Sequence, residues 1–190
     1  EENMQKLLRA RDSRKWKISR DGKRITAWNA LLLKALVDAA IALNSKEYLT
    51  MASKLAYWMK QHLLDEEGNI LSLRYENQPS ENSAFLDDYA FWAEGLLALS
   101  SVSEWIEPAS SENYLKDAEH FALKAMEEFH DEESPGYFFG PKHLDCPPPT
   151  KKKFWYDNAI PSGNSSMLRV FASLYLLRGE VSWKKKYLEI

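Results

Sequence analysis

Three segments of the chain are apolar around most of a helical circumference. They cover residues 26–43, 85–99 and 162–178, and between residues 30 and 43 Lys34 and Asp38 are the charged positions. A helix that is apolar on most sides packs against more than one neighbour. The pattern therefore predicts three internal helices of a layered all-α fold, the first of them with Thr26 as its N-cap.

Each internal segment is followed by a segment with one apolar face. These cover residues 45–64 and 111–130, and a third begins near Trp183. An apolar stripe at helical spacing opposite a charged face is typical of a surface helix, and Ser45 is the expected N-cap of the first. Acidic turns at residues 65–69 and 131–136 come next, followed by short runs at 70–75 and 137–139 that we expect to be strands.

The two helix types recur as a repeat. Tyr48, Tyr114 and Tyr187 occupy matching positions in the one-faced helices, at spacings of 66 and 73 residues. A period of this length indicates stacked helical hairpins, here about 26–75, 85–140 and 162–190, within a single domain over residues 1–190. The prediction is an all-α fold, an α/α-hairpin repeat with short β-hairpins between repeats. Inner and outer helices in two layers indicate part of an (α/α)6 toroid, whose missing hairpins would leave an open apolar edge.

Composition narrows the classes of partner. The 190 residues are 45% hydrophobic and carry a net charge of −3, which gives no electrostatic case for nucleic acid, and no apolar run has membrane-spanning length. Cys146 is the one cysteine, so we expect no internal disulfide, no metal site, no cofactor and a cytoplasmic location. The basic residues among 1–25 and the triplet Lys151–Lys153 are interpreted as solvated surfaces.

Candidate chemistry gathers where the inner helices begin, because loops on a rigid scaffold carry function. Asp87 and Asp88 are about 100° apart on a helix, so one is expected to cap the helix and the other to face a central cleft. Both acids would also suit the positive end of the helix dipole with no further role. The predicted catalytic acids are Asp88 and Asp157. The predicted substrate-binding residues are Trp28, Asn29, Asp87, Tyr89, Trp155, Tyr156, Ser162 and Asn164.

Three motifs carry a resemblance to a known family. The stretches at residues 26–29 (TAWN), 85–91 (FLDDYAF) and 156–165 (YDNAIPSGNS) are similar to the thioredoxin-domain-containing proteins related to spermatogenesis-associated protein 20. The resemblance implies a six-hairpin α/α barrel similar to those of glycosidases and N-acylglucosamine 2-epimerase. It also implies an amino-terminal thioredoxin-like domain, which this chain lacks. Ile18 and Gly22 stand where the family usually has a proline and an acid.

Two functions follow from these observations. The first is carbohydrate binding or glycosidase-like processing, with a carbohydrate ligand held by acids and aromatic rings at the inner-helix starts. The second is a non-catalytic binding or scaffold module that partners the thioredoxin-like domain and the remaining hairpins implied by the resemblance. Side chains satisfied by local backbone would favour the second function, and side chains open to a cleft would favour the first.

Overall fold

The computed structural model describes residues 2–13, 21–75, 83–102, 105, 108–142 and 151–190. Cys146 and Ile18 lie outside these residues. The elements, in chain order, are α1 Glu2–Asp12, β1 Arg24–Ile25, α2 Thr26–Ala42, α3 Lys46–His62, β2 Leu73–Arg74, α4 Leu86–Val102, α5 Pro108–Phe129, α6 Gly163–Arg178 and α7 Val181–Leu188. The predicted helices begin and end within three residues of these bounds.

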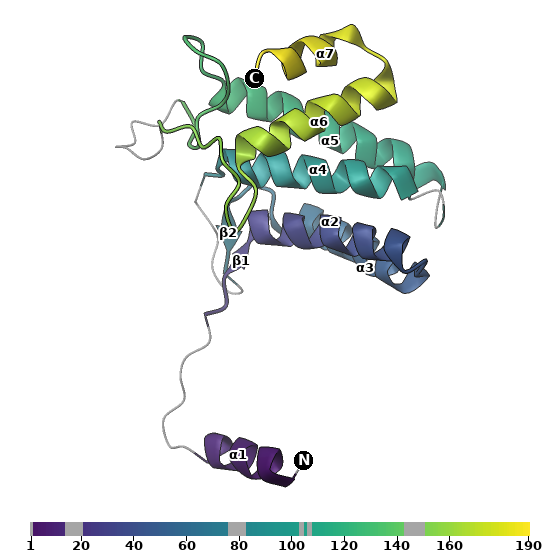
Figure 1. Ribbon diagram of the computed structural model, residues 1–190, viewed down its shortest axis with the longest axis vertical. Helices are drawn as coiled ribbons and strands as arrows, with labels where there is room; N and C mark the ends of the chain where they lie inside the picture. Colours follow the sequence, from purple (N-terminus) through teal and green to yellow (C-terminus); the bar gives the residue numbers. More distant parts are fainter. Residues whose placement is uncertain (1, 14–20, 76–82, 103–104, 106–107, 143–150) are drawn as a thin grey trace.

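Helices α2, α4 and α6 form an inner layer, with α4 in the middle (Figure 1). Helices α3, α5 and α7 each follow an inner helix and pack on it from one side. Because α4 contacts α2, α5 and α6, most of its residues are buried, as its apolar sequence predicts. The all-α hairpin architecture predicted from the sequence is confirmed.

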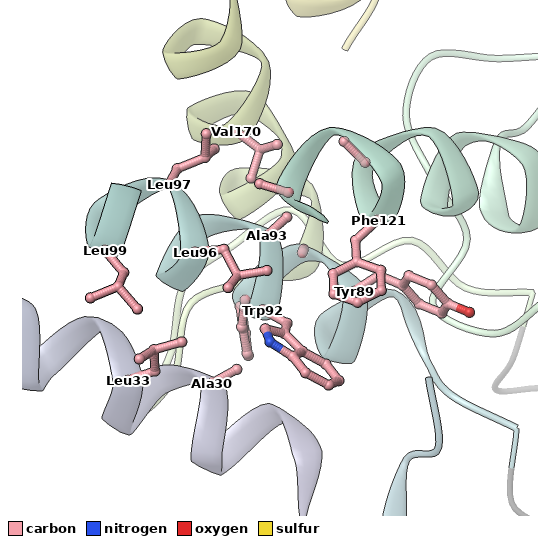
Figure 2. Packing of buried hydrophobic residues seen from close by; sticks show 14 of the residues in the cluster. Ala30, Leu33, Tyr89, Trp92, Ala93, Leu96, Leu97, Leu99, Phe121 and Val170 are labelled. Carbon is pink, nitrogen blue, oxygen red and sulfur yellow. The ribbon is translucent and has the colours of Figure 1, made fainter. Parts of the chain in front are cut away.

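The core is centred on α4. Figure 2 shows Leu33 and Ala30 of α2 on one side of α4 and Val170 of α6 on the other. Trp92 is fully buried and packs its ring against Phe121 of α5, with the ring centroids 4.9 Å apart. Aromatic and aliphatic residues of helices α2 to α7 thus form one continuous hydrophobic cluster around α4.

The β-structure is limited to one two-stranded sheet and a few isolated bridges among the described residues. β1 pairs antiparallel with β2, so that Ile25 lies opposite Leu73. Leu64 and Ile70 form a bridge across the acidic turn after α3, and His130 and Tyr137 form the equivalent bridge after α5. The expected strand after residue 70 is therefore present, but its second half pairs with the residues before α2.

Two predicted N-caps act differently from expectation. Thr26 is the first residue of α2, and its hydroxyl donates to the carbonyl oxygen of Leu71 instead of accepting from its own helix. Ser45 stands at the N-cap position of α3 without a side-chain cap bond. In α6, by contrast, Ser162 accepts a bond from the backbone of Ser165, and Gly179 ends the helix at a φ of 71°. Among the described helices, none is long and apolar enough to cross a membrane.

Candidate functional site

Asp88 links the start of α4 to the start of α2. It is the third residue of its helix, and one carboxylate oxygen accepts the N–H of Phe85 at 2.9 Å, as an acid at this position of a capping box does. The other oxygen accepts the N–H of Ala27 in the first turn of α2, also at 2.9 Å. Asp88 is 3% exposed, and burial raises its pKa to about 7 despite these two donors. Its contacts favour a positioning role.

Asp87 links the start of α4 to the start of α6. Its carboxylate accepts the N–H of Gly163, and burial raises its pKa to about 6. A Cβ built on Gly163 would lie 2.6 Å from the Asp87 carboxylate, so glycine permits this approach. Asp87 is partly exposed, whereas Asp88 is buried. The two acids therefore point to different sides of α4, as their spacing predicts, and Asp88 is the one that caps.

Asn164 and Asp157 hold the segment before α6. The Asn164 side chain is 1% exposed; it accepts from the N–H of Tyr137 and donates to the carbonyls of Tyr137 and Phe154, all within 3.1 Å. Asp157 accepts the N–H of Ser162 at 2.9 Å, and this bond lowers the pKa of the Asp157 carboxyl. Ser162 is buried and caps α6. These predicted site residues are engaged by neighbouring backbone and side chains.

Three further predicted site residues lie near the first turns of α2 and α4. Asn29 donates to the carbonyl of Ile25 at 2.8 Å. Tyr89 is 5% exposed, accepts the N–H of Ile70, and has its pKa raised to about 12 by burial. Trp28 differs from both, because 63% of it is exposed. Of these three, Trp28 is the residue with a large surface available to a ligand.

The loop before α6 carries the last two predicted aromatic residues. Tyr156 is 90% exposed and Trp155 is 41% exposed. The inner part of the Trp155 ring fills the space beside Gly136, where an added Cβ would lie 2.3 Å from it. Trp155 therefore anchors the loop, while Tyr156 presents its ring to solvent.

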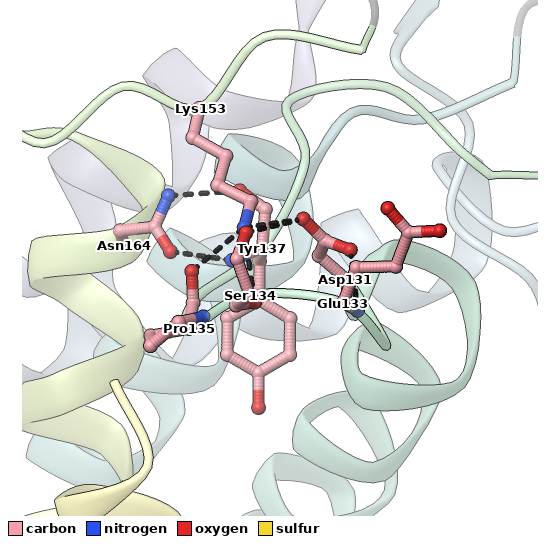
Figure 3. Close-up of polar contacts among 7 residues, drawn as sticks. All are labelled: Asp131, Glu133, Ser134, Pro135, Tyr137, Lys153 and Asn164. Carbon is pink, nitrogen blue, oxygen red and sulfur yellow. Dashed lines mark hydrogen bonds and ion pairs between the residues drawn. The ribbon is translucent and has the colours of Figure 1, made fainter.

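Lys153, which is largely shielded from solvent, fastens this loop to the turn after α5 (Figure 3). Lys153 lies 2.6 Å from the carboxylate of Asp131 and donates to the carbonyls of Ser134 and Pro135. Its side chain is 12% exposed, whereas Lys151 and Lys152 are exposed. The ion pair with Lys153 holds the pKa of Asp131 well below its usual range. The interpretation of the lysine triplet as a solvated surface is therefore wrong for Lys153, because its ammonium bonds to groups of the turn.

An ion pair that the sequence analysis missed lies between α4 and α6. Glu94 of α4 and Arg169 of α6 are 2.9 Å apart, and the Glu94 side chain is 13% exposed. They line a cavity of about 460 Å³ with Lys34 and with the apolar residues Leu97, Ala98, Ala172, Leu176 and Leu177. Glu94 follows Asp87 by seven residues, so both lie on one face of α4, two turns apart. The presence of the charged Glu94 inside an otherwise apolar helix was the sequence signal that could have identified this pair.

The polar groups here are carboxylates, amides and an ion pair. Within the described residues, no group of three His, Cys, Asp or Glu side chains is placed to hold a metal ion. The cavity beside Glu94 and Arg169 combines hydrogen-bond donors and acceptors with apolar lining residues, which suits a ligand with hydroxyl groups and apolar faces.

The fold of the chain is similar to the α/α toroids of several solved structures. It matches a sugar epimerase from a ruminal bacterium with a TM-score of 0.69 at 14% identity, covering 90% of this chain and 43% of that one. It also matches an α-1,6-mannanase from Salegentibacter sp., TM-score 0.64 at 17% identity, covering 98% of this chain and 50% of that one. That structure is an inactive variant, with two consecutive aspartates replaced by alanine, in complex with α-1,6-mannotetrose. At these identities the likeness shows the fold.

The sequence itself is similar to a particular protein. Spermatogenesis-associated protein 20 from Rattus norvegicus is 30% identical over 196 aligned residues, which cover 96% of this chain. The chain spans 23% of that relative's length. No protein-family model matches the chain. The resemblance predicted from the three motifs is thereby confirmed over nearly the whole chain.

Proposed function

We propose that the cavity beside the Glu94 and Arg169 pair binds a carbohydrate, between the middle of α2 and the C-terminal halves of α4 and α6. The observation that carries the proposal is the cavity beside Glu94 and Arg169 on the same face of α4 as the partly exposed Asp87. Its volume of about 460 Å³ lies within the usual range for small-molecule sites. Trp28 in the first turn of α2 and Tyr156 before α6 are exposed but do not line this cavity, and they are the rings proposed to stack on further units of a longer sugar chain.

The charges of the cavity suit a neutral hydroxylated ligand. Glu94 and Arg169 neutralise each other, and Lys34 pairs with Asp38 at 2.7 Å. Paired side chains retain donors and acceptors for hydroxyl groups without imposing a net charge on the ligand. The apolar side chains of Leu97 and Ala98 would contact the C–H faces of the sugar.

Calorimetric titration with manno- and cello-oligosaccharides tests the binding. Arg169→Met removes the donor group and keeps most of the chain length, so we expect affinity to fall about tenfold, near 1.4 kcal/mol. Arg11→Met is the matched control, because Arg11 pairs with Asp12 on the exposed helix α1. Equal binding by the two variants, or no saturable binding by the unchanged chain, would contradict the proposal.

A second candidate function is glycoside hydrolysis with Asp87 as the proton donor. It is favoured by the partial exposure of Asp87 and by its pKa of about 6, since a general acid must still hold its proton near neutral pH. The Salegentibacter mannanase, whose inactive variant lacks two consecutive aspartates, is consistent with it. The assignment of Asp88 and Asp157 as the acid pair stays a prediction, and their backbone contacts favour positioning roles.

Release of reducing sugar from α-1,6-mannan tests this second function. We expect Asp87→Asn to abolish release while oligosaccharide binding persists, because the amide keeps the shape of the side chain and loses the transferable proton. If Asp87→Asn retains activity and Asp88→Asn, folded to the same extent, loses it, the original assignment of Asp88 is the better one.

A further inference from the structure

Three phenylalanine rings contact one another in a row at the start of α4. Phe85, the residue before the helix, stacks on Phe139, with the ring centroids 4.7 Å apart and the ring planes at 11°. Phe139 and Phe154 are perpendicular, with centroids 5.3 Å apart and planes at 82°. Both arrangements are among those that aromatic pairs prefer. We call these three residues the phenylalanine row.

The phenylalanine row remains partly open to solvent in the middle of the inner layer. Phe85 and Phe139 are half-buried, and Phe154 is 47% exposed. The three rings come from segments before α4, after α5 and before α6, and the backbone joins these segments. The carbonyl of Phe139 accepts the N–H of Leu86 at 2.9 Å, and its N–H donates to the carbonyl of Lys152 at 2.8 Å. The row is therefore a fixed aromatic surface built from three parts of this chain.

Tyr156 follows the row by two residues, on a loop that is anchored on both sides of it. Asn164 donates to the carbonyl of Phe154 at 3.1 Å, and Asp157 accepts the N–H of Ser162 at 2.9 Å. The Tyr156 side chain is nevertheless 90% exposed, so it adds little to the packing of the fold. An exposed tyrosine on an anchored loop can bind a ligand at a small cost in conformational entropy, because the ring has few rotatable bonds.

These rings lie some distance from the cavity proposed to bind carbohydrate. Arg169, which lines that cavity, follows Gly163 at the start of α6 by six residues, which is about 9 Å at the rise of an α-helix. A ligand that contacts both Arg169 and the rings at the helix starts therefore spans at least about 9 Å. A chain of several sugar units spans this distance, and a single sugar unit does not.

We propose that the phenylalanine row and Tyr156 form a binding strip for a linear, neutral polysaccharide whose further units occupy the cavity beside Glu94 and Arg169. We call the row and Tyr156 together the aromatic strip. The proposal rests on the proposed carbohydrate binding by the cavity and adds the class of substrate, a polymer. The C–H faces of successive sugar units match a series of aromatic surfaces.

The charges that flank the aromatic strip in the sequence favour a neutral chain over a charged one. Lys151 and Lys152 are exposed shortly before Phe154, whereas Asp157 is exposed and Asp87 partly exposed. Two cations and two acids carry no net charge, so these groups give a polyanion or a polycation no long-range attraction.

Calorimetric titration with manno- and cello-oligosaccharides, from disaccharide to octasaccharide, tests the proposal. The measured quantity is the ratio of the octasaccharide to the disaccharide association constant, which we expect to be about tenfold or more for the unchanged chain. Tyr156→Ala and Phe154→Leu should each lower this ratio about threefold or more, because each removes one stacking ring. Tyr57→Ala is the matched control, since Tyr57 is 68% exposed on the outer helix α3, and it should keep the ratio.

The outcomes distinguish the aromatic strip from the cavity. Circular dichroism verifies that the variants are folded, and Phe154→Leu keeps an apolar side chain against Phe139 for this purpose. If short oligosaccharides bind but the ratio is near one, or if folded Tyr156→Ala and Phe154→Leu keep the ratio of the unchanged chain, the strip is overturned and the cavity is not. If no oligosaccharide binds, or if Arg169→Met binds every length as tightly as the unchanged chain, the cavity is overturned and the strip with it.

Discussion

The carboxylate of Asp88 accepts the backbone N–H of Ala27 at 2.9 Å, across 61 residues of sequence. The adjacent Asp87 accepts the N–H of Gly163 at the start of α6. One pair of consecutive acids thus bonds to the first turns of both neighbouring inner helices. Backbone N–H groups in a first turn have no intrahelical acceptor, so each acid satisfies a donor that would otherwise need water.

Replacing Asp88 should destabilise the fold more than its single charge suggests. Asp88→Ala removes the acceptor of two N–H groups at a site that is 3% exposed, and we expect a loss of about 2–4 kcal/mol in the free energy of unfolding. Urea unfolding followed by circular dichroism measures it. Asp38→Ala is the control, because Asp38 forms an exposed pair with Lys34 and should change stability by less than about 0.5 kcal/mol. Similar losses of unfolding free energy in the two variants would show that the contacts of Asp88 with Ala27 and Phe85 contribute little to stability.

Gly163 should not tolerate a side chain. A Cβ at this position would lie 2.6 Å from the Asp87 carboxylate and 2.7 Å from the Leu86 side chain, so Gly163→Ala forces α4 and α6 apart. We expect a destabilisation of about 1–3 kcal/mol, typical of overpacking, measured by thermal or urea unfolding. Gly22→Ala is the matched control, since no atom lies within 4 Å of its added Cβ. An unchanged Gly163→Ala midpoint would contradict the close approach.

The acid pair should make stability depend on pH in a definite direction. Burial raises the pKa of Asp87 to about 6, above the value near 3.9 of an unfolded chain. Between these two values the folded state binds the proton more tightly, so the contribution of Asp87 to stability falls as pH rises from about 4 to about 6.

Asp87→Asn isolates this contribution. We expect wild-type stability relative to the variant to decrease from pH 4 to pH 6, by at most about 1.4 kcal/mol per pH unit, and to level off above pH 7. Urea unfolding of both proteins at each pH gives the difference. A difference that grows in favour of the wild type over this range would mean that the Gly163 bond outweighs burial.

The helices were predictable because their patterns are strong and local. The α4 sequence is apolar around most of its circumference and does lie between three helices. The spacing of Asp87 and Asp88 predicts that they point to different sides; Asp88 caps α4, and a central cleft for the other acid stays a prediction. The sequence also pointed to Asn164 as a polar residue of interest, but its hydrogen-bond partner Tyr137 is 27 residues away. Such partners depend on tertiary packing, which periodicity does not encode.

The ion pair of Glu94 and Arg169 is a second example of a tertiary contact that could not be predicted from sequence periodicity. The two residues are 75 positions apart, and nothing in the pattern of α6 singles out Arg169 from other surface arginines. Thr26 is not the cap because α2 begins one residue earlier than predicted, with Ile25 at the N-cap position, and the Thr26 hydroxyl donates to the distant carbonyl of Leu71. Long-range pairs decide what a polar residue does after the helices are placed.

Lys153 should control the order of the loop that carries Trp155 and Tyr156. Lys153→Gln loses the ion pair with Asp131 and the donors to the Ser134 and Pro135 carbonyls, since an amide reaches less far and carries no charge. We expect amide hydrogens of residues 151–162 to exchange on the order of tenfold faster, while those of α4 stay protected. Lys151→Gln is the control, because Lys151 is exposed. If both variants exchange like the wild type, the loop is held by Asn164 and the Trp155 ring without the lysine.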